Sequence, residues 1–199
     1  MADMYQTLTD RLAPLLRRAD VAACEQLVLE QLTALPESPF HVAAELAFTV
    51  HPKVFAADFD GFFARQSKRF EVAALYTEMN AFQFNTRDWY YDKFAYRAYG
   101  GLEPDDWLSH WDGESQPTRL QGMYKLQRVY ASKVAREPGH ADVFLVAGRL
   151  VLVRFWQLLG EAAALMRKVR VPLLCSAHDA GLFLELRHNT SGGTVLGGE

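Results

Sequence analysis

Cysteine is scarce in this chain of 199 residues, with only Cys24 and Cys175 present and far apart. So few cysteines exclude a scaffold built on disulfides and are typical of a protein from a reducing compartment. Metal-binding patterns are missing too: the six histidines include no His-Glu-x-x-His stretch, and no Cys-x-x-Cys pair occurs. Paired glycines such as Gly100-Gly101 and Gly192-Gly193 lack the rest of a phosphate-binding fingerprint. We therefore expect no metal and no cofactor.

Basic charge is also in short supply. The chain carries 21 Lys and Arg against 24 Asp and Glu, and basic pairs such as Arg17-Arg18 and Arg167-Lys168 are short and isolated. A nucleic-acid-binding protein would show a basic stripe, so we expect no nucleic-acid partner. No uncharged apolar run approaches the roughly 20 residues of a membrane span, and the N-terminus lacks the pattern of a secretory signal. These absences predict a cytoplasmic protein that does not enter a membrane.

The pattern that is present is mostly helical. Half of the residues are apolar, enough for one core, and apolar residues recur at helical spacing along most of the chain. The segments with this pattern are 4–18, 21–35, 39–50, 54–66, 68–81, 87–99, 104–111, 117–135 and 140–168. In the longest, 140–168, apolar side chains cover about half of the circumference, which is typical of a helix at the centre of a core.

The period changes after this longest helix. Residues 169–176 and 182–187 are strand-like runs joined by a loop of about five residues, which predicts a β-hairpin. A lone hairpin is barely stable in water, so we expect a third strand, and 82–85 alternates suitably. The fold prediction is therefore mainly α: a multi-helix single domain over 1–188 around the longest helix, with a small C-terminal β-hairpin. Residues 189–199 are Gly-rich and predict a flexible tail.

Aromatic residues and acidic charge are concentrated between residues 82 and 114. This stretch holds ten of the 25 aromatic residues (13 Phe, 8 Tyr and 4 Trp), and its seven acids against three bases give a net charge of −4. Taken as a helix, 87–99 places Trp89 and Tyr96 on the same arc as Asp92, away from the apolar side. Rigid rings beside carboxylates are favoured at protein interfaces, because they bury much area at little entropic cost. The other interpretation is that both rings pack beneath a neighbouring loop.

These features predict a non-enzymatic module that docks another protein through an acidic, aromatic-rich face. The partner would carry a basic surface, as for an immunity-type or adaptor protein, and acidic complementarity would speed association and reject wrong partners. The residues expected to contact the partner are Trp89, Asp92, Tyr96, Asp105, Asp106 and Asp112. Trp107 and Trp111, four residues apart, are expected to anchor their segment in the core.

The alternative is an enzyme or a small-ligand-binding protein. A catalytic cysteine needs a histidine to form the thiolate and an acid to orient that ring, and Cys175, His178 and Asp179 are the candidates. On a strand, however, Cys175 and His178 would point to opposite sides, which favours a buried structural cysteine. Arg149 and Arg154 adjoin the apolar face of the longest helix, where they could pair with carboxylates or line an anion pocket. A pocket lined by Arg154 belongs to this alternative.

A short acidic motif lies within the segment 54–66. Its hydrophobic-Asp58-x-Asp60-Gly61 pattern resembles the start of the haloacid dehalogenase phosphatases, and the resemblance implies a nucleophilic Asp58 with a Mg²⁺ ion. In that family the motif follows a buried strand, and threonine follows the glycine. Here Phe62 follows the glycine, and no alternating strands and helices surround the motif. We therefore expect the segment to be an ordinary helix.

Overall fold

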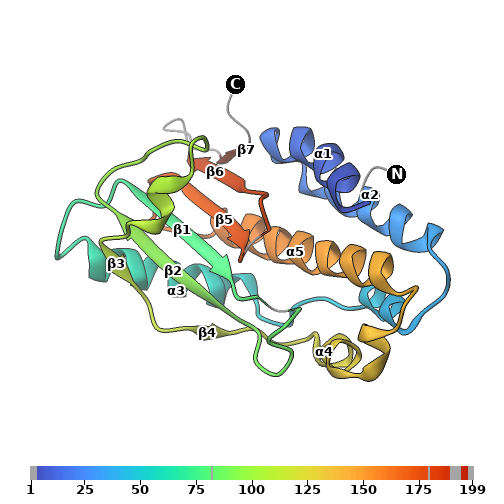
Figure 1. The fold of residues 1–199 in the computed structure, drawn as a ribbon. Helices are drawn as coiled ribbons and strands as arrows, with labels where there is room; N and C mark the ends of the chain where they lie inside the picture. The colour runs from blue at the N-terminus through green and yellow to red at the C-terminus, as the bar shows by residue number, and fades with distance from the viewer. Residues whose placement is uncertain (1–3, 82, 179, 189–193, 197–199) are drawn as a thin grey trace.

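The computed structural model describes residues 4–81, 83–178, 180–188 and 194–196, and in it helices pack against one face of a mixed β-sheet (Figure 1). The α-helices are α1 (Met4–Arg17), α2 (Val21–Ala34), α3 (Pro52–Gln66), α4 (Tyr124–Ala131) and α5 (Ala141–Ala163). The short 3-10 helices are η1 (Pro39–Glu45), η2 (Asp106–Ser109) and η3 (Lys133–Arg136). The strands are β1 (Ala74–Met79), β2 (Tyr90–Tyr96), β3 (Gly113–Glu114), β4 (Thr118–Arg119), β5 (Leu173–Ala177), β6 (Leu184–His188) and β7 (Thr194–Leu196).

Local capping fixes where several N-terminal helices begin. The Asp20 side chain accepts a hydrogen bond from the backbone N–H of Ala23 and starts α2. Ser38 and His41 form a reciprocal capping box at the start of η1. Pro52 occupies the first turn of α3, where a missing N–H costs no helical hydrogen bond. Each of these capping contacts joins residues that are close together in the sequence.

The sheet joins parts of the chain that are far apart. Its strand order is β3-β2-β1-β5-β6-β7, and β4 pairs with the same side of β2 as β3 does. The central pair, β1 and β5, is parallel, and every other pairing among the described residues is antiparallel. Leu75 lies opposite Leu173 in the central pair, so 98 residues (173 − 75) separate these partners. A parallel pair needs a crossover, and α4 and α5 lie within it.

The prediction of a mainly α fold is wrong, because the chain forms a seven-stranded mixed sheet. Residues 68–81 and 87–99, which were expected to be helices, contain β1 and β2 in the middle of that sheet. Of the segment 82–85, expected to supply a third strand, residue 82 lies outside the described residues and the other three are not in a strand. The third strand, which pairs with β5 of the C-terminal hairpin, is β1 instead.

Burial along β2 alternates with a period of two, which is the signature of a strand. Tyr91, Lys93 and Ala95 are buried, whereas Asp92 and Phe94 are partly exposed. Because Lys93 is one of the buried residues, the alternation of burial does not show as an alternation of apolar and polar residues in the sequence. Strand preference depends on cross-strand partners, and the partners of β2 lie 12 (91 − 79) to 29 (119 − 90) residues away, outside the local pattern.

Two local expectations are confirmed. The longest helix, expected over 140–168, is α5, although it ends at Ala163. The C-terminal hairpin is the antiparallel pair of β5 and β6. Of the tail expected over 189–199, only Thr194–Leu196 is described, and it forms β7 beside β6.

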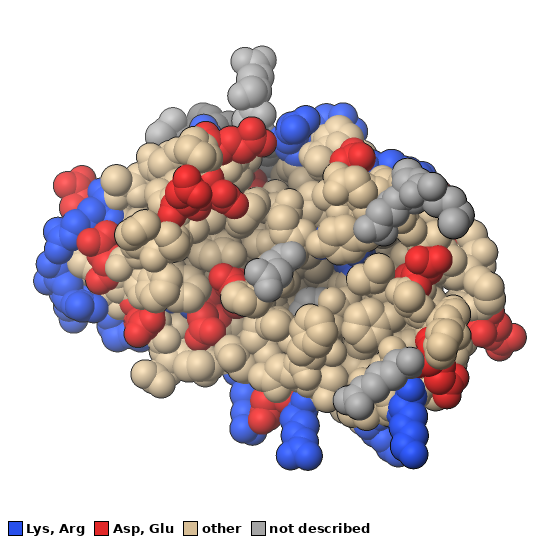
Figure 2. Space-filling view, in the orientation of Figure 1, with Lys and Arg blue, Asp and Glu red and all other residues tan. Residues whose placement is uncertain are grey.

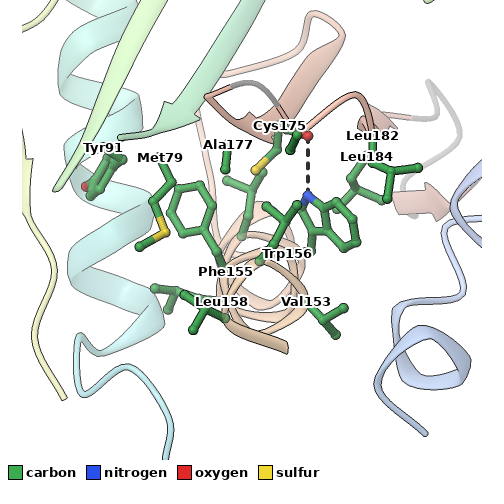
Figure 3. Close-up of a cluster of buried hydrophobic side chains, with 14 of the residues drawn as sticks. Met79, Tyr91, Val153, Phe155, Trp156, Leu158, Cys175, Ala177, Leu182 and Leu184 are labelled. Carbon is green, nitrogen blue, oxygen red and sulfur yellow. Dashed lines mark hydrogen bonds between the residues drawn. The ribbon is translucent and has the colours of Figure 1, made fainter. Parts of the chain in front are cut away.

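α5 lies at the centre of the main core. Phe155 and Trp156 are fully buried in it, and the Trp156 Nε1 donates a hydrogen bond to the carbonyl oxygen of Cys175 in β5 at 3.3 Å (Figure 3). The same cluster of buried side chains extends from Leu8 in α1 to Leu186 in β6. Burying one large apolar side chain stabilises a fold by about 1.5–3 kcal/mol, so this helix contributes much of the stability.

α5 is also long and apolar enough to cross a membrane, judged by length and composition. It has 23 residues, and its most apolar window has a mean hydropathy of 1.6. However, 72% of that window is buried inside the protein. Helices α2 and α3 pack against α5, as neighbours pack against the core helix of a globular protein.

Candidate functional site

The two faces of the sheet differ in what covers them. α3 and α5 lie behind the sheet in Figure 1, and Leu75, Met79 and Tyr91 on that side belong to the main core. Side chains alternate along a strand, so the neighbouring positions point away from α5. We call this second side the open face, and its central residues are Tyr76 and Glu78 of β1, Asp92 and Phe94 of β2, and Glu114 of β3. One end of the open face is covered by the segment 99–108.

Four aromatic rings form a row across the open face. Phe94 lies between Trp111 and Tyr76, with ring centroids 4.9 Å and 5.8 Å away, and Tyr76 contacts Phe183 at 6.1 Å. Phe94 and Phe183 are partly exposed. Trp111 was expected to anchor in the core, but it is 45% exposed, so that expectation is wrong. This aromatic row (Trp111, Phe94, Tyr76 and Phe183) is a continuous line of ring contacts in which solvent reaches Trp111, Phe94 and Phe183, whereas Tyr76 is buried.

Three carboxylates lie beside the aromatic row. Glu78 is directly opposite Asp92 on the neighbouring strand, and Glu114 is opposite Phe94. The pKa of Asp92 is raised, first by burial and next by the charge of Glu78, while Lys93 lowers it and Glu114 raises it further. We call Glu78, Asp92 and Glu114 the acid group. Figure 2, which views the open face, shows acidic side chains over the sheet and basic ones mainly along the margins.

The structure buries the two rings that were expected to be exposed. Trp89 is 1% exposed and Tyr96 is 2% exposed, so that expectation is wrong. Trp89 packs in the main core beside Tyr130, and Tyr96 donates a hydrogen bond to the carbonyl oxygen of Leu108 at 2.8 Å. Burial raises the pKa of Tyr96. Residues seven apart share a side of a helix but lie on opposite sides of a strand, which is why Trp89 and Tyr96 are separated.

The other predicted contact residues are carboxylates. Asp92 belongs to the acid group, and Asp105 and Asp106 are exposed at the start of η2. Asp112 accepts hydrogen bonds from the backbone N–H and the Nε of Arg97, at 2.8 Å and 3.1 Å. The structure therefore leaves Asp92, Asp105 and Asp106 accessible, while Asp112 already has a cationic partner. That these acids contact a partner protein stays a prediction.

The surroundings of Cys175 do not favour a catalytic thiolate. Cys175 is completely buried in the main core, and burial raises the pKa of its thiol. His178 is exposed, and its Nδ1 lies 2.6 Å from a carboxylate oxygen of Glu78 on the open face. Asp179, the third candidate, lies outside the described residues. Cys24 is also fully buried, and burial raises its pKa to about 12. A nucleophilic cysteine requires the opposite shift.

Arg154 joins two helices. Its guanidinium forms an ion pair with Glu25 of α2 and a hydrogen bond with Gln157. Gln157 also donates a hydrogen bond to Glu25, so one carboxylate receives both side chains of α5. The structural pairing considered for Arg154 is therefore confirmed.

A buried ion pair that the sequence does not reveal lies between α3 and β2. Lys93 is 1% exposed, and its Nζ donates to Asp58 at 2.6 Å and to Thr118 at 3.0 Å. The Tyr91 hydroxyl donates to the same Asp58 oxygen at 2.6 Å. Burial lowers the pKa of Lys93, and the hydrogen bond and charge of Asp58 oppose that shift. Nothing in the sequence pairs two residues 35 positions apart (93 − 58).

Asp60, the second acid of the phosphatase-like motif, binds backbone N–H groups of the segment that follows α5. Its two carboxylate oxygens accept hydrogen bonds from the backbone N–H groups of Arg167, Lys168 and Val169. The motif lies inside α3 and not after a strand, so the structural context of the phosphatase family is missing. Both aspartates are occupied in holding α3 to the rest of the fold.

Comparisons of the chain with protein-family models, with curated proteins and with solved structures found no match. Within the described parts of the chain, no group of three or more His, Cys, Asp or Glu side chains is arranged to hold a metal ion. The function is therefore inferred from the side chains of the molecule itself.

Proposed function

We propose that the open face is a docking surface for a partner protein that presents a basic patch. The observation that carries this proposal is the register of β1 and β2, which places Glu78 directly opposite Asp92 on a part of the sheet that solvent reaches. Like charges directly opposite each other on neighbouring strands destabilise a sheet. His178 already contacts Glu78, but Asp92 has no ion pair among the described residues, so a cation supplied by a partner would offset the remaining repulsion and favour binding.

The aromatic row supplies the second half of the interface. Trp111 and Phe94 are large, rigid rings with exposed area, and such rings supply most of the binding energy at many interfaces. An arginine from the partner fits this surface well, because its guanidinium stacks on an aromatic ring while its N–H groups reach a carboxylate. Glu114, Asp105 and Asp106 at the edges add negative potential that speeds the encounter with a basic protein.

The test compares three variants of the full chain in affinity capture from a lysate of the source cells. The charge variant replaces Glu78, Asp92 and Glu114 with Gln, Asn and Gln. The ring variant carries Trp111→Ala. The matched control replaces three exposed acids away from the open face, Glu30, Glu37 and Glu161, with Gln.

The expected result is a basic protein captured by the wild type and the control but lost from the charge variant. With that protein purified, Trp111→Ala is expected to weaken binding by about 2 kcal/mol, roughly 30-fold, mainly by faster dissociation. The charge variant is expected to slow association at low salt more than at high salt. Equal recovery by all four proteins, with the variants folded, would remove the open face as the docking surface.

A further inference from the structure

A cavity of about 160 Å³ lies at the carboxyl ends of β1 and β5. The two strands are parallel and point the same way in Figure 1, and Leu145, Arg149 and Leu152 of the N-terminal half of α5 line the cavity beyond their ends. In open sheets, ligands bind where parallel strands end, because the strands stop there and the loops diverge. The residues that line the cavity and matter for its chemistry are Tyr5, Leu145, Arg149, Leu152, Ala177 and His178.

Arg149 is the unusual member of this lining. It is 5% exposed, yet no carboxylate among the described residues lies within ion-pair distance of it. Its Nη1 donates to the carbonyl oxygen of Ala180 at 3.0 Å, and its Nη2 donates to the Thr9 hydroxyl at 3.3 Å. The ring of Tyr5 lies 4.2 Å from the guanidinium carbon. All of these partners are uncharged, so none of the described residues neutralises the positive charge.

The donor groups of Arg149 are not all used either. A guanidinium has five N–H groups, and the two hydrogen bonds above leave Nε as a buried nitrogen without an acceptor. The Nε of Arg154 also lacks an acceptor, but Arg154 differs from Arg149 in having a carboxylate partner, Glu25, as Lys93 has Asp58. A buried cation without a counter-ion is costly unless an anion completes the site.

We propose that the cavity binds a small monocarboxylic acid, with its carboxylate on Arg149 and its apolar part against Leu145, Leu152 and Ala177. A planar guanidinium matches a carboxylate in shape and charge. The volume is close to that of an engineered cavity of about 150 Å³ that binds benzene, so a ligand with a short chain or one ring fits. A phosphate dianion suits the cavity less well, because the wall offers one cation and is otherwise mostly apolar. This inference does not depend on docking at the open face.

The test uses isothermal titration calorimetry with two pairs of probes that differ in charge but little in shape. Benzoate is compared with benzamide, and butanoate with butanamide, while inorganic phosphate is the third anion. The wild type is expected to bind at least one carboxylate with a Kd of about 1 mM or tighter. The matching amide is expected to bind at least about 30-fold more weakly, because it cannot neutralise the guanidinium.

Two variants on the same helix separate an anion site from a structural arginine. Arg149→Met keeps an apolar side chain of similar length, and it is expected to weaken carboxylate binding at least about 30-fold while leaving amide binding unchanged. Arg154→Met removes the arginine that is already paired, and it is expected to retain carboxylate binding. Without ligand, Arg149→Met is expected to melt at the same temperature as the wild type or higher, because an uncompensated buried charge is gone.

Three outcomes would overturn the proposal. They are the absence of saturable carboxylate binding to the wild type, equal carboxylate binding by Arg149→Met, and binding of phosphate in place of both carboxylates. Loss of thermal stability in Arg149→Met, together with unchanged carboxylate binding, would identify Arg149 as a structural residue. The capture experiment at the open face is read out separately, so either proposal can fail while the other stands.

Discussion

The covered face and the open face of the same two strands differ in how their charged groups are partnered. On the covered face, β2 carries Lys93, and Asp58 of α3 reaches it at 2.6 Å. On the open face, the same strand carries Asp92, and the residue directly opposite is a second carboxylate, Glu78. Packing and pairing explain the covered face. On the open face, the Nδ1 of His178 lies 2.6 Å from Glu78, but Asp92 has no ion pair among the described residues, so the opposed carboxylates are where binding residues are to be sought.

The largest expected difference between the faces is the cost of removing an aromatic ring. Trp156→Ala, on the covered side, is expected to lower the free energy of unfolding by about 3–5 kcal/mol, because it leaves a cavity in the main core. Trp111→Ala, at the exposed end of the aromatic row, is expected to cost less than about 1 kcal/mol. Denaturant unfolding of both variants measures the two values. Similar costs would mean that the open face also stabilises the fold.

The next effect concerns the buried pair. Asp58→Ala strands the ammonium group of Lys93, and we expect a loss of about 2–3 kcal/mol at pH 7, below the usual cost of breaking a buried pair because Asp58 is partly exposed. Lys93 in the folded protein has a lowered pKa, and removing Asp58 lowers it further. The folded variant then releases its proton before the unfolded chain does, so stability rises with pH in this range.

Unfolding curves recorded at increasing pH test this sign. The stability deficit of Asp58→Ala is expected to shrink as the pH rises toward 10.5, the ordinary pKa of lysine. Lys93→Met in the same background supplies the control, because it removes the titrating group and makes the deficit independent of pH. A deficit that grows with pH would contradict the assignment of a stranded lysine.

The smallest expected effect is on the open face, and it has the opposite sign. Asp92→Asn is expected to raise the free energy of unfolding by about 0.2–1 kcal/mol at pH 7, because it removes repulsion with Glu78. The pKa of Asp92 is raised in the folded protein, so its ionisation costs stability at neutral pH. That cost disappears below pH 3.8, where the carboxyl group is protonated in both states.

Thermal or chemical unfolding at pH 7 and pH 3 measures the gain and its disappearance. Asp105→Asn is the control, since Asp105 is exposed and has no directly opposed carboxylate in the described strands. A loss of stability in Asp92→Asn would show that Asp92 helps to hold the sheet together.

The sequence predicted what depends on neighbours in the chain. The long helix α5 and the C-terminal hairpin were both predicted from local patterns. The concentration of aromatic and acidic residues in 82–114 also pointed to the region that forms much of the open face. It indicated the right segment, although it assigned Trp89 and Tyr96 to the surface.

The parts of the fold and of the candidate sites that were not predicted depend on contacts between residues that are not neighbours in the sequence. β1 and β2 were taken for helices because their strand partners lie outside the local pattern, from 12 residues away (Met79 opposite Tyr91) to 98 (Leu75 opposite Leu173), and the buried Lys93 broke the apolar alternation. The choice of a helical period then put Trp89 and Tyr96 on one side, whereas a strand separates them. Arg149 was recognised as a candidate for an anion pocket or an ion pair, but the cavity beside it is formed by four separate parts of the chain.

The parallel pairing of β1 with β5 has a consequence for synthesis of the chain. The inner edge of β1 finds its neighbour only when residues from Leu173 onward have left the ribosome. Until then, the backbone groups along that edge have no strand beside them, and contacts across such long separations form slowly. The nascent protein is therefore most exposed to aggregation between the emergence of β1 and that of β5, and chaperones would be needed most during that interval.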